Sequence, residues 1–287
     1  MIVRSLLYVP GSNPKFIDKA HTRGADAIII DLEDAVAPSM KTPAREALAQ
    51  SVPTAGKAGT PVFVRINEGE DRRFADAEAA CRAGAFGLYL PKVEAASSLS
   101  LMADFLAPIE AELGRKPMCF VPLVETPRGV FAALDIASAP RVFALSGGGE
   151  DLATAMGGLP LPHVLSLPKQ LIHLAAKAVG VRSFGLLRTV ADYSDLEGMR
   201  AAALEARQFG FDGASCIHPS VVEVLNAAFA PSDAEIAWAR KVVEADDVSA
   251  TSGVGAHTVD GQFIDAPIVA RARALLALAS TLEDKNG

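Results

Sequence analysis

The sequence predicts an α/β protein, a (β/α)8 TIM barrel with a C-terminal helical lid extension. Eight short apolar runs, each followed by a polar or Gly/Pro-rich turn, recur through the first 220 residues. Stretches rich in Ala, Leu, Glu and Arg separate these runs and have helical character. The runs are apolar without interruption, and such runs indicate parallel strands that are covered by helices on their outer face.

The predicted strands are Ser5–Val9, Ala27–Leu32, Val62–Ile66, Gly87–Leu90, Met118–Val124, Val142–Leu145, Ser183–Leu187 and Gly213–Ile217. The predicted helices between them include Pro14–Arg23, Phe74–Ala83, Ser97–Leu113, Gly129–Ala137, Lys169–Val179 and Asp195–Phe209. An open doubly wound sheet is the alternative. Its glycine-rich nucleotide fingerprint is missing after the first strand, where the chain reads Tyr-Val-Pro-Gly-Ser, and this absence favours the barrel.

The pattern changes after the eighth strand, which predicts a barrel over residues 1–229 and a helical lid and oligomerisation extension over 230–287. The extension has predicted helices at Ser232–Ala245 and Pro267–Leu282. The small-residue segment Thr251–Ala256 between them is typical of a mobile lid. The last helix has apolar residues that we expect to pack on the barrel of a neighbouring subunit, with folding onto its own barrel as the alternative. These residues are Ile268, Val269, Leu275, Leu276 and Leu278.

The composition excludes several classes of protein. A formal charge of −7 without any run of Lys and Arg argues against a nucleic-acid-binding surface. The cysteines are three in number and far apart, so we expect reduced thiols rather than a disulfide or zinc site. The sequence shows neither a signal-peptide pattern nor an apolar run of about 18 residues that could span a membrane. We therefore expect a cytoplasmic protein with no membrane partner.

Two carboxylates follow neighbouring predicted strands and suggest a metal site. Active sites of such barrels are built at the C-terminal ends of the strands. Neighbouring strands lie about 4.8 Å apart, so Glu125 and Asp151 can reach one point above the barrel mouth. Mg²⁺ prefers oxygen ligands and keeps several waters, so two carboxylates suffice. The structural alternatives are pairing of Glu125 with Arg128 and capping of the next helix by Asp151.

Arg65 ends the third strand, beside the predicted metal. Its guanidinium could bind a carboxylate or stabilise an enolate oxygen, and it could equally pair with the acidic cluster Asp31, Glu33 and Asp34. The two roles are compatible.

Other polar residues give weaker signals. Lys15 and Lys19 lie one turn apart on the first helix and could meet the phosphates of a long substrate, although such lysines are usually solvated. His218 follows the eighth strand, where an imidazole serves as often in a structural hydrogen bond as in ligand binding.

The chain resembles the citrate lyase beta-subunit-like family of the HpcH/HpaI aldolase superfamily, which includes citramalyl-CoA lyase and malyl-CoA lyase. The resemblance covers nearly the whole chain. The motifs that carry it are Leu7–Ser12, Asp31–Ala37, Val64–Asn67, Leu90–Lys92, Val124–Thr126, Gly149–Leu152, Gly210–Gly213, Ile217–Pro219 and Gly261–Pro267.

The resemblance implies that Glu125 and Asp151 bind Mg²⁺, for which Mn²⁺ can substitute, and that Arg65 is catalytic and contacts the acyl group. It implies substrate binding by Tyr8, Lys15, Lys19, Asp31, Glu33, Asp34, Arg65, Ile217 and His218. It also implies that Asp265 is catalytic and comes from a neighbouring subunit on the C-terminal lid, in a homo-oligomer (trimer or hexamer) with shared active sites. The position of Asp265 just before Pro267 by itself predicts only a helix N-cap.

The implied reaction is the Mg²⁺-dependent retro-Claisen cleavage of a citramalyl-CoA-type or malyl-CoA-type thioester to acetyl-CoA and a 2-oxo acid. The alternatives are a malyl-CoA thioesterase, an aldolase on free 2-oxo-4-hydroxy acids, a citryl-carrier-protein lyase subunit and a non-catalytic subunit of a lyase complex. Three departures from the family pattern bear on the acyl group. Ala214 and Ser215 stand where relatives commonly have a lysine, and the seventh strand lacks an acidic residue that relatives often have. The stretch between Asp151 and Leu171 is also short and rich in proline.

Overall fold

The computed structural model describes residues 1–252 and 257–286, which form two units. One unit comprises Val3–Asn226, and the other comprises Met1–Ile2 with the chain from Ala227 onward. Of the predicted lid segment, Thr251 and Ser252 form the end of a helix, and residues 253–256 lie outside the described part of the chain.

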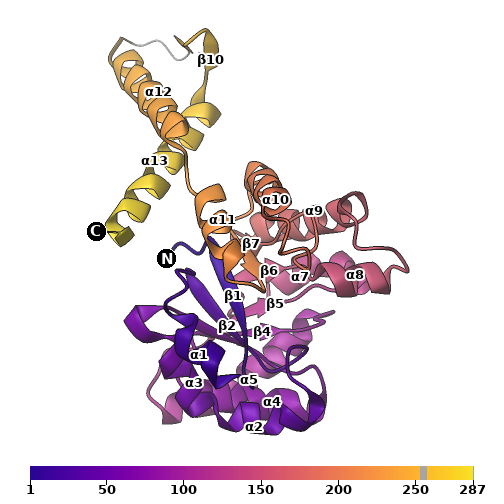
Figure 1. The fold of residues 1–287 in the computed structure, drawn as a ribbon. Helices are drawn as coiled ribbons and strands as arrows, with labels where there is room; N and C mark the ends of the chain where they lie inside the picture. The colour runs from indigo at the N-terminus through magenta and orange to yellow at the C-terminus, as the bar shows by residue number, and fades with distance from the viewer. Residues whose placement is uncertain (253–256, 287) are drawn as a thin grey trace. The chain divides into compact units, whose positions relative to one another are not determined.

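The larger unit is an α/β fold whose parallel sheet curls (Figure 1). Six strands pair in the order β5-β4-β3-β2-β1-β8, and β6 pairs with β7 in a separate parallel ladder. Isolated bridges join Phe120 to Val142 and Phe184 to Gly213. The strands are β1 Ser5–Pro10, β2 Ala27–Asp31, β3 Val62–Arg65, β4 Gly87–Leu90, β5 Cys119–Pro122, β6 Ala144–Ser146, β7 Arg182–Phe184 and β8 Ala214–Cys216. All eight predicted strands are confirmed as elements.

The helices of this unit alternate with the strands. They are α1 Pro14–Ala20, α2 Lys41–Glu46, α3 Leu48–Ala55, α4 Glu70–Arg82, α5 Ala96–Glu112, α6 Pro127–Phe131, α7 Ala133–Ala137, α8 Gly149–Ala155, α9 Pro162–Ala178, α10 Leu196–Phe209 and the start of α11 Ser220–Ala228. The single helix predicted over 129–137 is wrong, because the chain leaves helical geometry at Ala132. The helices α2 and α3 were not predicted, since Pro43 and Pro53 weaken the helical pattern there.

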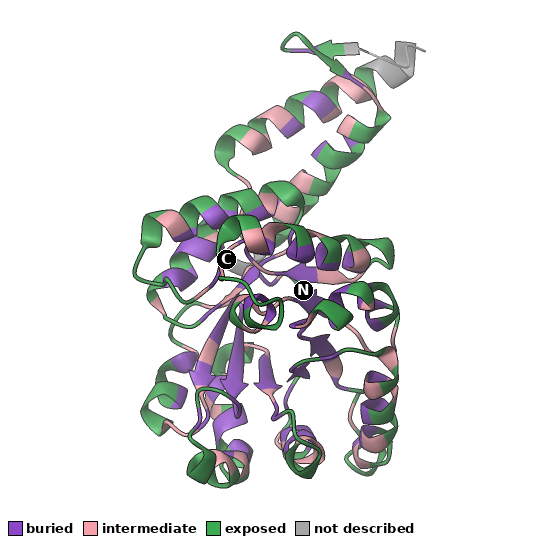
Figure 2. Ribbon diagram, turned by 90° about the vertical axis from the view of Figure 1, so that its right-hand side faces the viewer, coloured by how far each residue is buried: buried purple, intermediate pink, exposed green. Residues whose placement is uncertain are grey.

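Large side chains fill the space enclosed by the strands. Phe63, Tyr89 and Phe184 are almost fully buried in one apolar cluster with Leu6 and Ile29. The rings of Phe63 and Tyr89 meet edge to face with centroids 5.5 Å apart, a favourable aromatic geometry. Figure 2 shows the strands as buried and the outer helix faces as exposed. The packed interior leaves room for a ligand only at the ends of the strands.

The second unit has its own small core. Helices α12 Asp233–Ser252 and α13 Ala266–Asn286 pack together, joined by the antiparallel strands β9 His257–Val259 and β10 Gln262–Ile264. Val242 of α12 packs with Val269 of α13 and with Ile264. Some of the apolar face expected to contact a neighbouring barrel is therefore covered within its own unit.

Two further expectations concern the chain as a whole. None of the helices in the described residues is long and apolar enough to cross a membrane. Cys81, Cys119 and Cys216 are all free thiols, as the sequence predicted.

Gly213 provides a test of how closely the chain packs where β8 meets β1. A Cβ atom at Gly213 would lie 2.2 Å from the backbone oxygen of Val3. We expect Gly213→Ala to lower the free energy of unfolding by about 1–3 kcal/mol in a urea titration, because backbone atoms must move. Gly185 donates its N–H to the Gly213 carbonyl but has ordinary space for a Cβ. Gly185→Ala is the matched control, and an equal loss in both variants would contradict this account.

Candidate active site

A cavity of about 430 Å³ opens at the C-terminal ends of the strands in the larger unit. The side chains predicted from the sequence that line it are Tyr8, Asp31, Asp34, Arg65, Glu125, Asp151 and Ile217. They come together because parallel strands end at the same edge of the sheet. Further cavity residues that the sequence did not single out as site residues include Ser146, Glu150, Lys169, Leu186, Thr189 and Ser215.

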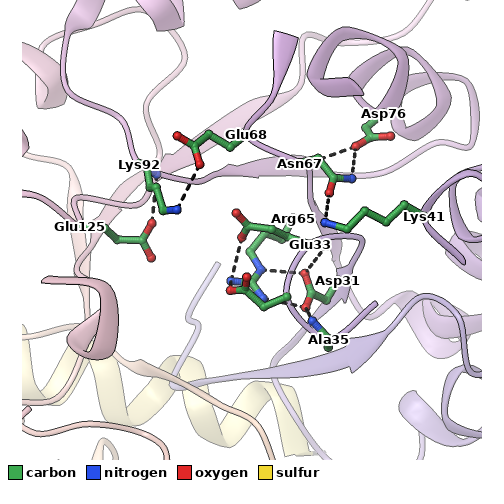
Figure 3. Close-up of polar contacts among 11 residues, drawn as sticks. Asp31, Glu33, Ala35, Lys41, Arg65, Asn67, Glu68, Asp76, Lys92 and Glu125 are labelled. Atoms are coloured by element: carbon green, nitrogen blue, oxygen red, sulfur yellow. Dashed lines mark hydrogen bonds and ion pairs between the residues drawn. The ribbon is translucent and has the colours of Figure 1, made fainter. Parts of the chain in front are cut away.

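The register of β2 and β3 places Asp31 directly opposite Arg65. The guanidinium donates through Nε and Nη2 to the two Asp31 carboxylate oxygens, each at 2.7 Å. The same carboxylate accepts the backbone N–H groups of Glu33 and Ala35, both at 2.9 Å. This two-pronged pair fixes the plane of the guanidinium and the turn after β2 together (Figure 3).

The outer edge of the Arg65 guanidinium meets two more carboxyl groups. Its Nη1 lies 2.9 Å from Asp34 and 3.0 Å from Glu33, and the guanidinium sits 5.0 Å from the centre of the Tyr8 ring. Burial raises the pKa of Glu33 to about 8, although Arg65 opposes this shift. The predicted pairing of Arg65 with the acidic cluster is confirmed.

Glu125 lies beyond β5 and is 4% exposed. Its carboxylate accepts the backbone N–H of Lys92 at 3.0 Å, and Lys92 adopts a left-handed backbone conformation with φ 48°. A Cβ on Gly148 would collide with this side chain, so any other residue there would require Glu125 to move. Burial, with a smaller contribution from Asp151, raises the pKa of Glu125 to about 7.

Asp151 is in the first turn of α8, whose N-cap is Gly148. The predicted capping role of Asp151 is therefore wrong, because the cap lies three residues earlier and no side chain caps this helix. The predicted pairing of Glu125 with Arg128 is also wrong, since Arg128 lies near Glu94. Within the described residues Asp151 has no hydrogen-bond or ion-pair partner, and it lines the cavity with Glu125.

These two carboxylates have the chemistry that a divalent cation requires. Burial raises the pKa of Glu125, so its charged carboxylate is poorly solvated and would be stabilised by a bound cation. No group of three or more His, Cys, Asp or Glu side chains suited to a metal occurs in the described residues. A cation here would thus have two protein oxygen ligands and complete its shell with water or substrate, as Mg²⁺ commonly does.

Other predicted site residues are not among those that line this cavity. Lys15 and Lys19 are exposed on α1. His218 stacks on Tyr193 with ring centroids 4.9 Å apart, and its Nδ1 lies 2.7 Å from the Ser220 hydroxyl. Asp265 belongs to the second unit, where its carboxylate accepts the Ile268 N–H at 3.3 Å at the start of α13. Their roles in substrate binding and catalysis remain predictions.

The missed residues come from the side of the cavity formed by β6 and β7. Lys169 is 4% exposed in α9, and the Thr189 hydroxyl donates to Glu150. One signal in the sequence could have revealed Lys169. It shares the buried face of α9 with Leu165, Ile172 and Ala176, where an apolar residue is expected.

Comparisons with known proteins agree with this architecture. The family model described as HpcH/HpaI aldolase/citrate lyase matches residues 4–219. A (3S)-malyl-CoA thioesterase of Cereibacter sphaeroides is 35% identical over 97% of this chain and 95% of its own length. The citrate lyase subunit beta of Leuconostoc mesenteroides subsp. cremoris is 33% identical over 99% of this chain and 96% of its own.

A solved structure is similar over both units. It is the protein CitE from Mycobacterium tuberculosis in complex with magnesium, acetoacetate and coenzyme A, with a TM-score of 0.79 and 31% identity over 97% of this chain and 98% of that one. The chain therefore belongs to the HpcH/HpaI aldolase/citrate lyase family.

Proposed function

We propose that this chain is a Mg²⁺-dependent carbon–carbon lyase that cleaves a 3-hydroxyacyl-CoA of the citramalyl or malyl type into acetyl-CoA and a 2-oxo acid. The observation that carries the proposal is the presence of two carboxylates, Glu125 and Asp151, in one cavity with Arg65. The CitE structure with magnesium, acetoacetate and coenzyme A supports it, since that protein is similar over nearly all of this chain.

Glu125 and Asp151 would hold Mg²⁺, which when bound acts as a Lewis acid toward the hydroxyl and carboxylate oxygens of the substrate. The left-handed turn at Lys92 and the glycine at position 148 keep the Glu125 carboxylate in place. Burial of this carboxylate keeps water away from it, which strengthens its attraction to a cation.

Arg65 is the residue to stabilise the negative charge that appears on the thioester oxygen as the carbon–carbon bond breaks. Hydrogen bonds to Asp31 and Asp34 use one N–H on each of its three nitrogens. A guanidinium has five N–H groups, and Glu33 lies 3.0 Å from Nη1, so the second N–H of Nη2 remains to meet a ligand. Because Asp31 holds the guanidinium rigidly, its donors need no reorganisation during the reaction.

The proposal extends to the closed (β/α)8 barrel and the lid. The isolated bridges from β5 to the segment before β6 and from β7 to the residue before β8 support closure of the strand ring. Residues 1–229 would form this barrel, and 230–287 would bring Asp265 to a neighbouring subunit, where it returns a proton to the acetyl-CoA enolate. The separate core of the second unit supports a part that can act away from its own barrel.

One alternative reaction has a specific observation in its favour. Relatives 35% identical to this chain are named (3S)-malyl-CoA thioesterase. A thioesterase would add water at the thioester carbonyl and release free CoA and the hydroxy acid, without breaking the carbon–carbon bond. The same carboxylates and Arg65 would serve it. A citryl-carrier-protein lyase subunit is the other candidate, from the similarity to citrate lyase subunit beta.

Product analysis tests the proposed reaction. Purified protein with Mg²⁺ is incubated with malyl-CoA, citramalyl-CoA or 3-hydroxy-3-methylglutaryl-CoA, and the products are identified by mass. We expect acetyl-CoA and a 2-oxo acid in equal amounts from malyl-CoA or citramalyl-CoA, and no products in EDTA. Free CoA together with an intact hydroxy acid would instead establish the thioesterase.

The raised pKa of Glu125 predicts how Mg²⁺ binding varies with pH. Protons and Mg²⁺ compete for this carboxylate, so Mg²⁺ affinity should fall by about tenfold per pH unit below about pH 7 and level off above it. Between pH 4.5 and pH 7 the folded chain binds a proton at Glu125 that the unfolded chain has already lost. Without metal, the contribution of this group to the free energy of unfolding therefore falls as the pH rises through this range.

The rise in melting temperature on adding Mg²⁺, or Mn²⁺, should therefore be larger at pH 8 than at pH 6. Glu125→Gln and Asp151→Asn should each abolish the rise. Glu94→Gln is the matched control, because Glu94 accepts from Thr126 and does not line the cavity. A full metal-induced shift in either site variant would refute the coordination.

Arg65→Lys tests the planar guanidinium. Lysine keeps the charge but cannot make the two-pronged bond to Asp31, so turnover should fall by roughly 10²-fold in a steady-state assay. Arg82 makes a similar forked pair with Glu112, but at the surface. Arg82→Lys should leave turnover unchanged. Comparable activity in the two variants would assign Arg65 a structural role only.

Complementation tests the shared active site. Asp265→Ala and Arg65→Ala subunits should each be inactive alone, because each lacks one proposed catalytic group. Mixed under conditions that allow subunit exchange, some oligomers would unite an intact barrel with an intact lid, and activity should return. Proven exchange between the two variants with no recovered activity would rule out sharing.

A further inference from the structure

The side of the cavity formed by β6 and β7 contains a buried lysine that the proposed reaction does not use. Lys169 lies in the middle of α9 and is 4% exposed, yet it lines the cavity. Lysine is almost never fully buried unless it has partners. Its Nζ donates to the backbone oxygens of Leu186 at 2.8 Å and Arg188 at 3.0 Å, both in the segment that follows β7.

The same side chain also lies against the turn after β6. A Cβ on Gly149 would be 3.4 Å from the lysine Nζ, and a Cβ on Gly147 would be 3.7 Å from its Cγ. Lys169 therefore lies between the Gly147–Gly149 turn and the segment after β7. Gly149 is the first residue of α8, whose first turn contains Asp151.

A second contact joins the same two segments. The Thr189 hydroxyl donates to the carboxylate of Glu150 in the first turn of α8, and it also accepts the N–H of Ala191. Glu150 is in addition the charged group that favours the ammonium form of Lys169, against the burial that lowers its pKa to about 8. Lys169, Glu150 and Thr189 thus connect α8 to the segment after β7.

We propose that Lys169 is a positioning residue that fixes the first turn of α8 against the segment after β7 and thereby holds Asp151 in place for Mg²⁺. The proposal rests on the metal assignment made above. Strands β6 and β7 are three residues each, so few backbone hydrogen bonds hold this side of the cavity. A buried ammonium with two carbonyl partners supplies the missing rigidity. Partners that orient a metal ligand typically change metal affinity when they are removed.

The test is Mg²⁺ binding measured by titration calorimetry. Lys169→Met keeps the length of the side chain and removes the donors, and Mg²⁺ affinity should fall by about 10–100-fold. Lys177→Met is the matched control, since Lys177 lies two turns further along α9 and pairs with Asp212. The control should bind Mg²⁺ as the wild type does, and both variants should unfold at similar urea concentrations without metal.

Thr189→Val provides an independent measurement if Lys169→Met does not fold. It should also weaken Mg²⁺ binding, and the double variant should lose less than the sum of the two single losses in binding free energy, because both residues restrain the same two segments. Wild-type Mg²⁺ affinity in Lys169→Met or in Thr189→Val, or an equal loss in Lys177→Met, would overturn the proposal.

These outcomes are separate from those that test the reaction. A wild-type protein that binds Mg²⁺ but cleaves no thioester would refute the proposed function and leave the role of Lys169 intact. An active lyase whose Mg²⁺ affinity is unchanged by Lys169→Met would support the proposed function and refute the role of Lys169. A wild type that binds no Mg²⁺ would overturn both.

Discussion

The pairing of Asp31 with Arg65 across β2 and β3 is the interaction on which the rest of the site depends. Parallel register alone makes these two residues neighbours. A shift of one residue would turn every side chain of a strand to the opposite face, so the buried isoleucines of β2 fix the ion pair along with the core. With Arg65 held by Asp31, the Nη1 group of its guanidinium contacts Asp34 and Glu33, and the face of the guanidinium lies over the Tyr8 ring.

An excess of carboxyl groups over cations distinguishes this cavity. Six acidic side chains and two cationic ones, Arg65 and Lys169, lie in or beside it. The acidic residues are Asp31, Glu33, Asp34, Glu125, Glu150 and Asp151. Burying like charges together is costly, and burial raises the pKa values of both Glu33 and Glu125. A divalent cation would neutralise the same charge, so metal binding and proton release at this site are physically linked.

The two sides of the cavity are built differently. The Arg65 side rests on strands of four to six residues joined by continuous ladders. The β6–β7 side has strands of three residues and depends on isolated bridges and side-chain contacts such as those of Lys169 and Thr189. The segment Gly147–Gly149 lets that side approach Glu125 closely. Because glycine leaves the backbone conformationally free, other groups must restrain this segment.

The sequence by itself determined the eight strands and the residues that gather at their ends. Uninterrupted apolar runs specify buried parallel strands, and parallel strands bring Asp31, Arg65, Glu125 and Asp151 to one edge whatever the details of packing. The sequence also indicated the pairing of Arg65 with its acidic neighbours, because opposite charges at adjacent strand ends have few other partners.

Only the tertiary structure decided how these groups are oriented and charged. The sequence allowed Asp151 to cap a helix, but the helix begins at Gly149 and its N-cap is Gly148, so Asp151 lies in the first turn instead. Lys169 appears in the sequence as one residue of an ordinary helix, and its role emerges from carbonyl groups 17 and 19 residues away. The local sequence pattern shows which residues are apolar. Helix cap positions, the protonation of side chains and buried hydrogen bonds depend instead on the neighbours that folding brings together.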